Sequence, residues 1–581
     1  MVGAAIYCGY HGLDSRVAWV AGSVAFAAFC ALVRAHRRAA ARAAQARAVA
    51  AACRAGLARM ARDWTHIPPV RITRATSGRA ATAGDLDILG DISLFRLLDV
   101  TTPALGGERL LEWLLGDPAD LPTIMSRQAS VAALRARPDV LVESAVVGRH
   151  GPYMRSATSP RAVHAFVDWC AQPSGSETHW TRQSRIAAGC SVLIVALIAW
   201  RTEAAVPFII ALVAVQLLLA ARARKHLTSS LAGLGSLLPQ LRGLDASMQL
   251  IAREDDVAGA FGEVQQALRR QGASNSLGAL DTILVWNDVR LTPMAHFPLN
   301  SLFGADVHIA AALVRWRARS GIHVADWVDR TSSAQALAAL ATLAFENPRW
   351  AMPNVHDGAD APAFVGDAVT HPLLSPSVAV PNPVRIESSS TLLALSGSNM
   401  AGKTTYLRAI GLNAVLAFAG GPVSATGLTA RLARVRTSVR IEDDLGAGVS
   451  LFLAEVSQLR DIVRDSEVPS APPVLFLFDE ILHGTNAADR RHASQVVLRK
   501  LLAAGGFGVL TTHDADLVTD LFDASVMTQA QRVQQGHFRE TVQRDGEAVR
   551  MSFDYVLRPG PTTSANARVI LEMMGLEGAP G

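Results

Sequence analysis

The sequence has few charged residues, few aromatic residues and no recognisable cysteine motif. Only 18% of its 581 residues are charged and 6% are aromatic, whereas 50% are hydrophobic and the mean hydropathy is +0.23. The five cysteines form no C-x-x-C pair and lack zinc-ligand spacing, so we predict neither disulfides nor a metal–thiolate site. The shortage of charge suggests membrane segments. The net charge of +5 fits nucleic acid or an anionic membrane surface only weakly, because a solvated basic surface gives the same value.

Three apolar runs are candidates for membrane spans. They lie at 17–33, 186–200 and 204–221 and contain no charged residue. About 20 apolar residues cross a bilayer core, so the first and third runs are near that length and the second is shorter. Only Arg201-Thr202-Glu203 separates the second run from the third, which is typical of the tip of a transmembrane hairpin. A buried core helix is one alternative for the first run.

The distribution of arginine predicts how these runs are oriented. Eight arginines and no acidic residue lie between Arg34 and Arg62, directly after the first run. A signal peptide carries its basic residues before the apolar stretch, so this order argues against that alternative. The positive-inside rule places the arginine-rich stretch in the cytoplasm, together with "RARKH" after residue 221. We therefore expect a multi-pass protein of the cytoplasmic (inner) membrane whose N-terminus and hairpin tip lie outside.

The remaining patterns predict a helical part followed by an α/β part. Residues 35–62 are rich in Ala and Arg and predict a helix near the membrane, ended by Pro68-Pro69, that would bind anionic lipid. Short helices are expected from 84 to 150 and longer ones from 226 to 346. Pro, Asp and Gly accumulate at 353–383, and afterwards β-branched runs alternate with helices, which predicts a mostly parallel sheet.

The segment "TLLALSGSNMAGKTTYLRAIG" predicts a nucleotide-binding loop between a strand and a helix. It contains G-x-x-x-x-G-K-T, whose glycines let backbone N–H groups face phosphate at the N-terminus of the helix. Lys403 would reach the β- and γ-phosphates of ATP, and the Thr404 hydroxyl would bind Mg²⁺. We expect the whole loop to contact the nucleotide: Gly397, Ser398, Asn399, Met400, Ala401, Gly402, Lys403, Thr404 and Thr405.

Two further strand ends carry residues suited to ATP hydrolysis. The strand "PVLFLFDE" ends in Asp479, which would hold Mg²⁺ through its water shell, and Glu480, which would polarise the attacking water. The strand in "GFGVLTTHDADL" ends at His513, whose imidazole would contact the γ-phosphate. A solvated strand end and a structural histidine are the alternatives for each feature alone. The three strand ends together predict ATP binding and hydrolysis.

The residues after the two carboxylates distinguish classes of ATPase. Transporter-type ATPases continue with Pro and a Ser-Ala-Leu-Asp turn, whereas this chain continues as "DEILHGTN", which resembles the Asp-Glu-Ile-Gly-Arg-Gly-Thr of the MutS mismatch-repair family. Other segments resemble that family too: "SGSNMAGKTTYLRAIG", "RIEDDLGAGVSLFLAEVSQL", "TTHDADL" and "YVLRPGPTTSANARVILEMMGL". The resemblance is close from about 365 to 577. It is looser at 85–135, which is similar to the start of the family's helical core.

The resemblance implies a dimer and a DNA partner. In the family, ATP sites form across a dimer, so Ser450 is expected to reach the nucleotide of a second copy in trans. An ordinary helix N-cap is the alternative for this serine. The family's Asp-Asp pair corresponds to Asp443-Asp444, and 484–486 to a loop beside the dimer seam. DNA binding and a mismatch-repair-related role are likewise implied by the resemblance.

The departures from the family concern DNA recognition. Members that recognise mismatches carry an N-terminal domain with a Phe-x-Glu wedge, and we find no such element before the helical core. Little room exists for a DNA-clamp insertion between 226 and 365. The aromatic residue that often packs on adenine ahead of Val-x-Asn is replaced by small aliphatics in "SVAVPN".

We therefore predict an α/β P-loop NTPase domain of the ABC-type MutS kind, joined to a mostly α-helical core or lever domain with transmembrane helices. The expected segments are a transmembrane segment at 1–34, a juxtamembrane helix at 35–75, a helical core at 76–185, a transmembrane hairpin at 186–221, the rest of the core or lever at 222–360 and a cytoplasmic ATPase domain at 361–581. Three functions remain open. They are a homodimeric ATPase acting on branched or damaged DNA near the membrane, a membrane-remodelling or transport ATPase, and a nucleotide-gated scaffold.

Overall fold

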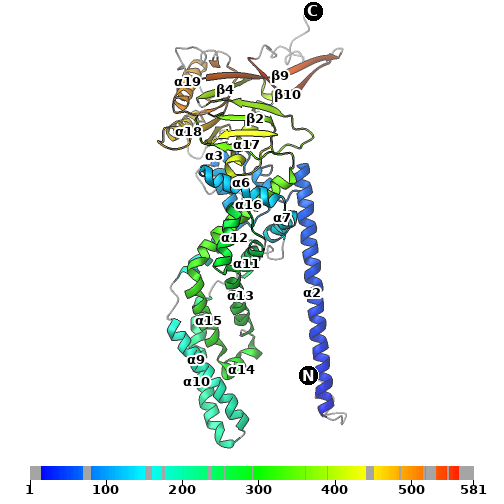
Figure 1. The fold of residues 1–581 in the computed structure, drawn as a ribbon, viewed down its shortest axis with the longest axis vertical. Helices are drawn as coiled ribbons and strands as arrows, with labels where there is room; N and C mark the ends of the chain where they lie inside the picture. The colour runs from blue at the N-terminus through cyan, green and yellow to red at the C-terminus, as the bar shows by residue number, and fades with distance from the viewer. Residues whose placement is uncertain are drawn as a thin grey trace, which may run out of the picture.

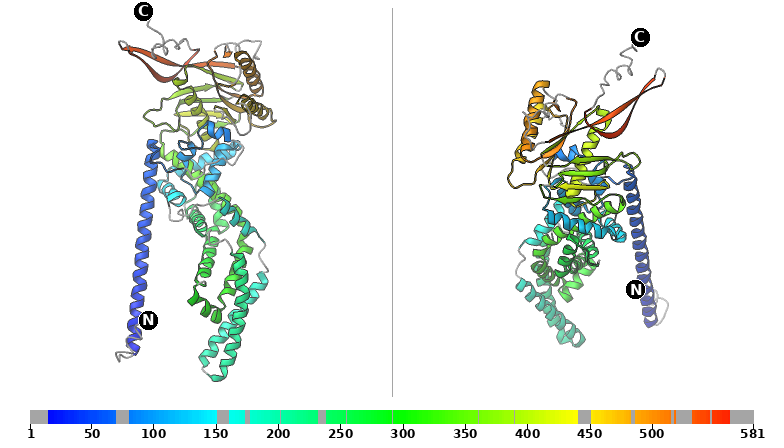
Figure 2. Two further views of the ribbon diagram at one scale, coloured as in Figure 1. Left: turned by 180° about the vertical axis from the view of Figure 1, so that it is seen from behind. Right: turned by 45° about the horizontal axis from the view of Figure 1, so that its top comes forward.

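The structure is a computed structural model. It describes residues 15–69, 80–150, 160–172, 177–200, 202–231, 238–253, 255–290, 292–359, 361–388, 390–439, 451–482, 486–514, 517–518, 532–545 and 548–561. An α/β head lies at one end, a helical lever extends from it, and one long helix, α2, runs beside the lever (Figure 1). The free ends of α2 and of the lever lie far from the head, at the same end of the molecule (Figure 2).

Helix α2 joins the first apolar run and the arginine-rich stretch into one element. It covers Ser15–Ala61, 47 residues, without a proline. It ends at Ala61, before Pro68-Pro69, and the next residue, Arg62, takes a φ of 57°. Its outer part is exposed, whereas Ala48, Ala52, Ala55 and Ala58 near its end are buried where α2 packs against α7 (Pro138–Ala145), η2 (Val146–His150) and α16 (Val324–Glu346). The sequence of small residues on one face permits this close packing.

The lever consists of helices that lead away from the head and then back towards it (Figure 1). Next to the head lie α3 (Ala80–Asp85), α4 (Leu94–Leu98), η1 (Pro103–Gly107), α5 (Glu108–Leu115), α6 (Leu121–Arg135), α7 (Pro138–Ala145), η2 (Val146–His150) and α8 (Pro160–Ala171). Further out lie α11 (Leu238–Arg253), α12 (Ala260–Arg270), α13 (Ala273–Arg290), α14 (Pro293–Phe303), α15 (Ala305–Ser320) and η6 (Gly321–His323). Helix α16 (Val324–Glu346) returns to the head with an Ala- and Leu-rich stretch that is buried on all sides.

A helical hairpin forms the tip of the lever. Helix α9 (Glu177–Trp200) and helix α10 (Val206–Ser230), joined through η4 (Glu203–Ala205), contain the second and third apolar runs. Within the described residues, three helices are long and apolar enough to cross a membrane: α9, the segment 203–230 that includes α10, and the part of α2 from Val20. Length and composition are the two properties by which these helices qualify.

The head contains two sheets in the described part of the chain. The smaller has the order β1-β5-β2-β3, from β1 (Asn354–His356), β5 (Gly427–Arg431), β2 (Phe364–Val369) and β3 (Asn382–Ile386). The larger has the order β10-β9-β4-β8-β7-β6, from β10 (Ala548–Pro559), β9 (Arg532–Asp545), β4 (Thr391–Ser396), β8 (Phe507–Thr511), β7 (Val474–Asp479) and β6 (Arg434–Ser438). All pairs in the larger sheet are parallel except β10 with β9. It is the mostly parallel sheet that the alternation of strands and helices predicts.

Helices cover both faces of the larger sheet. Along β7, Leu475 and Leu477 belong to the same core as α17 (Lys403–Ala419), whereas Phe476 and Phe478 pack in a second core with α18 (Leu451–Ser466) and α19 (Ala487–Ala503). Because strand side chains alternate, an uninterrupted apolar strand is the pattern that two covered faces require. The parallel strands β4, β7 and β8 end at one edge, which brings the three predicted strand ends together.

Candidate active site

The nucleotide-binding loop has the backbone that its glycines predict. It leaves β4 at Gly397 (φ 131°), passes through η7 (Asn399–Ala401) and enters α17 after Gly402 (φ 100°). A Cβ at Gly397 would lie 2.8 Å from the carbonyl oxygen of Phe538 on β9, so a side chain there would be both strained and blocked. The N-terminus of α17 presents the N–H groups of its first turn and its positive dipole end to the loop.

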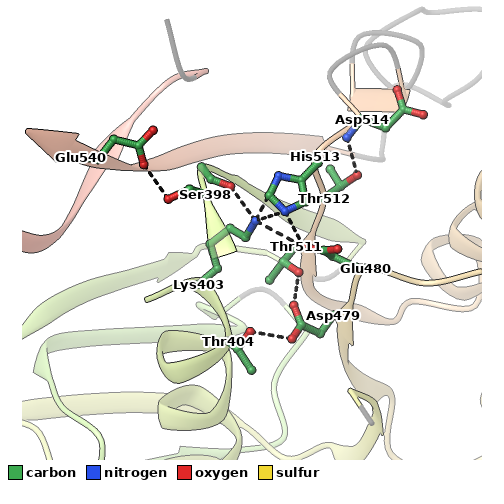
Figure 3. A network of polar contacts seen from close by, with 11 residues as sticks. Ser398, Lys403, Thr404, Asp479, Glu480, Thr511, Thr512, His513, Asp514 and Glu540 are labelled. Carbon is green, nitrogen blue, oxygen red and sulfur yellow. Dashed lines mark hydrogen bonds and ion pairs between the residues drawn. The ribbon is translucent and has the colours of Figure 1, made fainter. Parts of the chain in front are cut away.

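Lys403 lies at the centre of the site and is 1% exposed. Its Nζ donates to the carbonyl oxygen of Gly397 at 2.6 Å and contacts His513 Nε2 at 2.9 Å and Glu480 Oε1 at 3.4 Å (Figure 3). Burial lowers the pKa of Lys403, and the charge of Glu480 opposes that shift. A buried ammonium surrounded by acceptors is suited to the oxygens of a polyphosphate.

Asp479 and Thr404 form a second pair beside the lysine. The Thr404 hydroxyl donates to Asp479 Oδ2 at 2.6 Å, and Thr511 on β8 donates to the other carboxylate oxygen (Figure 3). Two hard oxygen donors at this distance fit Mg²⁺, which keeps several of its own waters and needs few protein ligands. No larger cluster of His, Cys, Asp or Glu suited to a metal occurs among the described residues.

Glu480 and His513 meet at the ends of β7 and β8. Glu480 Oε1 lies 2.6 Å from His513 Nε2. Glu480 has a φ of 51° and Leu482 a φ of 64°, so the turn after the strand is strained. The buried carboxylate of Glu455 on α18 accepts a hydrogen bond from the backbone N–H of Leu482 at 2.5 Å and holds this turn. The role of Glu455 was missed by the sequence analysis, although it lies in a segment that resembles the family.

A cavity of about 410 Å³ adjoins the loop. Its lining includes Val378, Val380, Thr405 and Tyr555. Tyr555 comes from β10, has a φ of 55° and stands over Gly402, where a Cβ would lie 3.1 Å from its ring. Asn382 ties it in place, because its amide donates to the carbonyl oxygen of Tyr555 at 2.9 Å and accepts from Leu557 N at 2.7 Å. A mostly apolar cavity lined by Tyr406, Phe538 and Tyr555 next to a phosphate-binding loop fits a nucleotide base.

Tyr555 supplies an aromatic side chain that "SVAVPN" lacks. Small aliphatics do stand ahead of Asn382, and they line the cavity as Val378 and Val380. The aromatic side chain arrives instead from a strand 173 residues further along the chain, counted from Asn382. Nothing in the sequence near the loop indicates this partner.

A third carboxylate, Glu540 on β9, also belongs to the site. The Ser398 hydroxyl donates to Glu540 Oε2 at 2.5 Å, and the Glu540 side chain is buried (Figure 3). The Ser398 hydroxyl thus has a buried acceptor on the neighbouring strand. This contact orients the loop from the strand behind it.

The structure brings most predicted site residues together. Gly397, Ser398, Gly402, Lys403, Thr404, Asp479, Glu480 and His513 lie around one point, and Thr405 lines the adjoining cavity. Asn399, Met400 and Ala401 form η7, in which Met400 is exposed and Ala401 buried. Ser450, Asp443, Asp444 and residues 484–485 lie outside the described residues. Asn486 caps α19, since its side chain accepts from Asp489 N at 2.9 Å.

Comparison with known proteins locates the likeness in the head. Residues 393–576 match the MutS domain V profile. The ATPase domain of this chain belongs to the MutS family. "DNA mismatch repair protein MutS" of Natronomonas pharaonis is 32% identical over 244 residues, which are 41% of this chain and 26% of that protein. "DNA mismatch repair protein MutS 2" of Halobacterium salinarum is 31% identical over 213 residues, 35% of this chain and 23% of that protein.

The likeness to these MutS proteins is confined to part of each chain. "DNA mismatch repair protein MutS 2" of Haloarcula marismortui is 32% identical over 188 residues, and only 18% of its length is covered. The chain thus spans about a quarter or less of the length of these curated relatives. The comparison establishes a MutS-type ATPase fold in the head, and ATP with Mg²⁺ is what such domains use in general.

Lowering the pH is expected to destabilise the MutS-type head through His371, which lines the cavity. Burial, with a smaller effect of Arg408, lowers the pKa of His371 from 6.5 to about 4. Its Nδ1 accepts from the backbone N–H of Leu373 at 3.3 Å, which requires a neutral ring. Between these pKa values the unfolded chain binds a proton that the folded chain does not. The free energy of unfolding therefore decreases as the pH is lowered, by up to about 3 kcal/mol.

The measurement is the thermal unfolding midpoint of the detergent-solubilised chain between pH 7 and pH 5. His371→Asn keeps an acceptor for Leu373 but cannot take up the proton, so its midpoint is expected to fall less over this range. Identical pH dependence in both proteins would contradict the assignment.

Proposed function

We propose that this protein binds and hydrolyses ATP in its MutS-type head, works as a homodimer on a lever held in the cytoplasmic membrane, and acts on DNA. The observation that carries the enzymatic part is the meeting of Lys403, Glu480 and His513 beside the Thr404–Asp479 pair at one sheet edge. A structural ion-pair cluster does not require a glycine loop, a helix N-terminus and a base-sized cavity at the same place.

The position of each side chain indicates its part in the chemistry. Loop N–H groups and the Lys403 ammonium bind the triphosphate, with the base in the cavity beside Tyr555. Thr404 and Asp479 would hold Mg²⁺, which would supply positive charge to the phosphates. Glu480 Oε1 orients the attacking water and accepts its proton, while His513 Nε2 donates toward a γ-phosphate oxygen. Ser450 of a second copy would complete each site in trans.

The membrane part of the proposal is supported by where the apolar helices end. The exposed apolar end of α2 and the tip of the α9–α10 hairpin lie at the end of the molecule opposite the head (Figures 1 and 2). The arginines that follow the apolar run of α2, and Arg222 and Arg224 on α10, lie on the head side of these apolar segments. One bilayer with the head in the cytoplasm satisfies both features.

The DNA part rests on the relatives and on charge. Two of the matched proteins are MutS and MutS 2 proteins of DNA mismatch repair by name. The structure divides the eight arginines of α2 and its end into two sets. Arg59 and Arg62 are buried, whereas six stand exposed along the helix and are free to meet phosphate: Arg34, Arg37, Arg38, Arg42, Arg47 and Arg54.

The test is steady-state ATP turnover by the detergent-purified chain, with Glu480→Ala as background. No DNA, homoduplex, mismatched duplex and four-way junction are compared at two salt concentrations. Stimulation by DNA that weakens with salt is expected, because phosphate contacts release counterions. An ATP turnover rate that none of these DNAs changes would refute the proposal that the protein acts on DNA. It would favour a membrane-remodelling or scaffold function.

A matched variant separates DNA from lipid as the partner of α2. Changing only its six exposed arginines to glutamine leaves Arg59 and Arg62 in their buried contacts. We expect this variant to keep basal turnover and to lose DNA stimulation. Unchanged stimulation together with weaker binding to anionic vesicles would assign the arginines to the membrane surface.

A further inference from the structure

Helix α14 has its polar side chains inside and its aromatic side chains outside. Phe297 is 65% exposed and Phe303 49% exposed, whereas Asn300 is 2% exposed and Ser301 is buried. The Asn300 side chain accepts from Asp306 N at 2.9 Å, and the Ser301 hydroxyl donates to the carbonyl oxygen of Phe297 at 2.8 Å. A helix facing water would have the opposite arrangement.

The hairpin beside α14 has the same inverted arrangement. Gln216 on α10 is 0% exposed, and its amide donates to the carbonyl oxygen of Ala187 and to the Ser191 hydroxyl, both at 2.9 Å. Its neighbours Val215 and Leu218 are exposed. Helix α14 packs against both α9 and α10, so Asn300 and Gln216 are buried polar side chains within a three-helix group whose outer surface is apolar.

The turn into α15 holds α14 across the hairpin. Gly304 has a φ of 58°, and a Cβ there would lie 2.4 Å from Gln216 Oε1 and 3.0 Å from the Cβ of Ala187. The segment His296–Phe303 makes an angle of 80° with the helix that follows it. Because α15 runs along α9 and α10, α14 lies crosswise to them, on the head side of the hairpin tip (Figure 1).

The end of the preceding helix, α13, indicates how deep α14 would lie in a bilayer. Trp286 near its end is 54% exposed, and Val285 and Val289 beside it are also exposed. Asp288 on the same turn is exposed too, which places this end at the boundary between water and lipid and not in the hydrocarbon centre. Tryptophan is the side chain that favours this boundary.

We propose that α13 and α15 dip to the cytoplasmic face of the bilayer and that α14 lies in that face, parallel to the membrane plane, with Phe297, Phe303 and Trp286 in lipid. This re-entrant element rests on the membrane location proposed above and adds to the three spans. It couples the lever to the bilayer directly, because α15 continues through η6 into α16, which enters the head. A tilt of the lever therefore moves α14 within the membrane surface.

The test is quenching of tryptophan fluorescence by brominated phosphatidylcholine in proteoliposomes of the full chain. The signal of Trp286 is the difference between wild type and Trp286→Phe, and Trp286→Phe with Phe297→Trp reports α14 itself. Both signals are expected to be quenched, more by bromine near the headgroup than by bromine deep in the chains. Trp286→Phe with Ile322→Trp is the water control, since exposed Ile322 lies at η6 on the lever, and it is expected to stay unquenched.

Trp200 at the hairpin tip distinguishes a failure of the proposed membrane location from a failure of the inference about α14. Quenching of Trp200, measured with Trp200→Phe, without quenching of Trp286 or of the Phe297→Trp signal would keep the membrane location and overturn the inference about α14. Quenching of none of these signals would overturn the membrane location itself. Stronger quenching of Trp286 by deep bromine would replace the in-plane helix with a spanning one and also overturn the inference.

Discussion

Lys403→Ala is expected to abolish ATP binding, whereas Glu480→Gln is expected to bind ATP and to turn it over about 10²- to 10⁴-fold more slowly. The two side chains lie 3.4 Å apart, yet their chemistry differs. Lys403 supplies the buried positive charge for the phosphates, and without it the site presents Glu480, Asp479 and Glu540 to a polyanion. Glu480 supplies the acceptor for a proton, a role that glutamine cannot fill although it keeps the shape and the contact with His513.

The measurement pairs equilibrium binding of a fluorescent ATP analogue with single-turnover hydrolysis by the full chain in detergent. Glu467→Gln is the matched control, because this carboxylate is exposed on the surface of the head just after α18. It is expected to bind and hydrolyse as the wild type does. Equal loss of binding in Lys403→Ala and Glu480→Gln would contradict the division of roles.

Glu346→Ala is expected to destabilise the protein by about 3–5 kcal/mol, which is the cost of leaving a buried charge without its partner. Glu346 at the end of α16 accepts from Arg59 Nε at 2.9 Å and forms a second contact with the same guanidinium. Arg62 donates beside it to Asn347 Oδ1 and to the carbonyl oxygen of Pro372. Removing Glu346 would leave two buried guanidinium groups without an acid.

The same contact connects α2 with the nucleotide cavity. Pro372 lies between His371, which lines the cavity, and Leu373, which donates to that histidine. A loosened α2 is therefore expected to weaken ATP binding as well as stability. Because α2 carries the first apolar run, this junction joins the proposed membrane helix to the head as well as to the lever.

Urea unfolding followed by tryptophan fluorescence in detergent measures the effect. Asp281→Ala is the matched control, since Asp281 pairs with Arg242 at 2.9 Å on the exposed surface and is expected to contribute about 1 kcal/mol or less. Arg59→Met with Glu346→Leu removes both charges and is expected to recover much of the loss. A Glu346→Ala variant as stable as Asp281→Ala would contradict the prediction that the buried Arg59–Glu346 pair is needed for stability.

The parts of the site that could be predicted from the sequence are those that a short local pattern defines. The glycine spacing around Lys403, the apolar strand before Asp479 and the apolar run before His513 each predict a strand end with a polar side chain. Parallel strands bring such ends to one edge, so the centre of the site followed from local pattern and topology together. Glu455, Glu540 and Tyr555 were not predicted, because each reaches the site from an element whose pairing is not encoded near the loop.

Local patterns were sufficient to predict the P-loop head, the mostly parallel sheet and the three apolar runs, since each is a local periodicity or a fixed spacing. The burial of particular arginines at the end of α2 depends on the fold, because Arg59 and Arg62 resemble the exposed six until Glu346 and Asn347 arrive from α16. The inversion of α14 depends on it too, because the burial of Asn300 and the exposure of Phe297 are set by where α9 and α10 pack. A side chain's neighbours across the fold, not those along the chain, set whether its polar atoms meet protein, water or lipid.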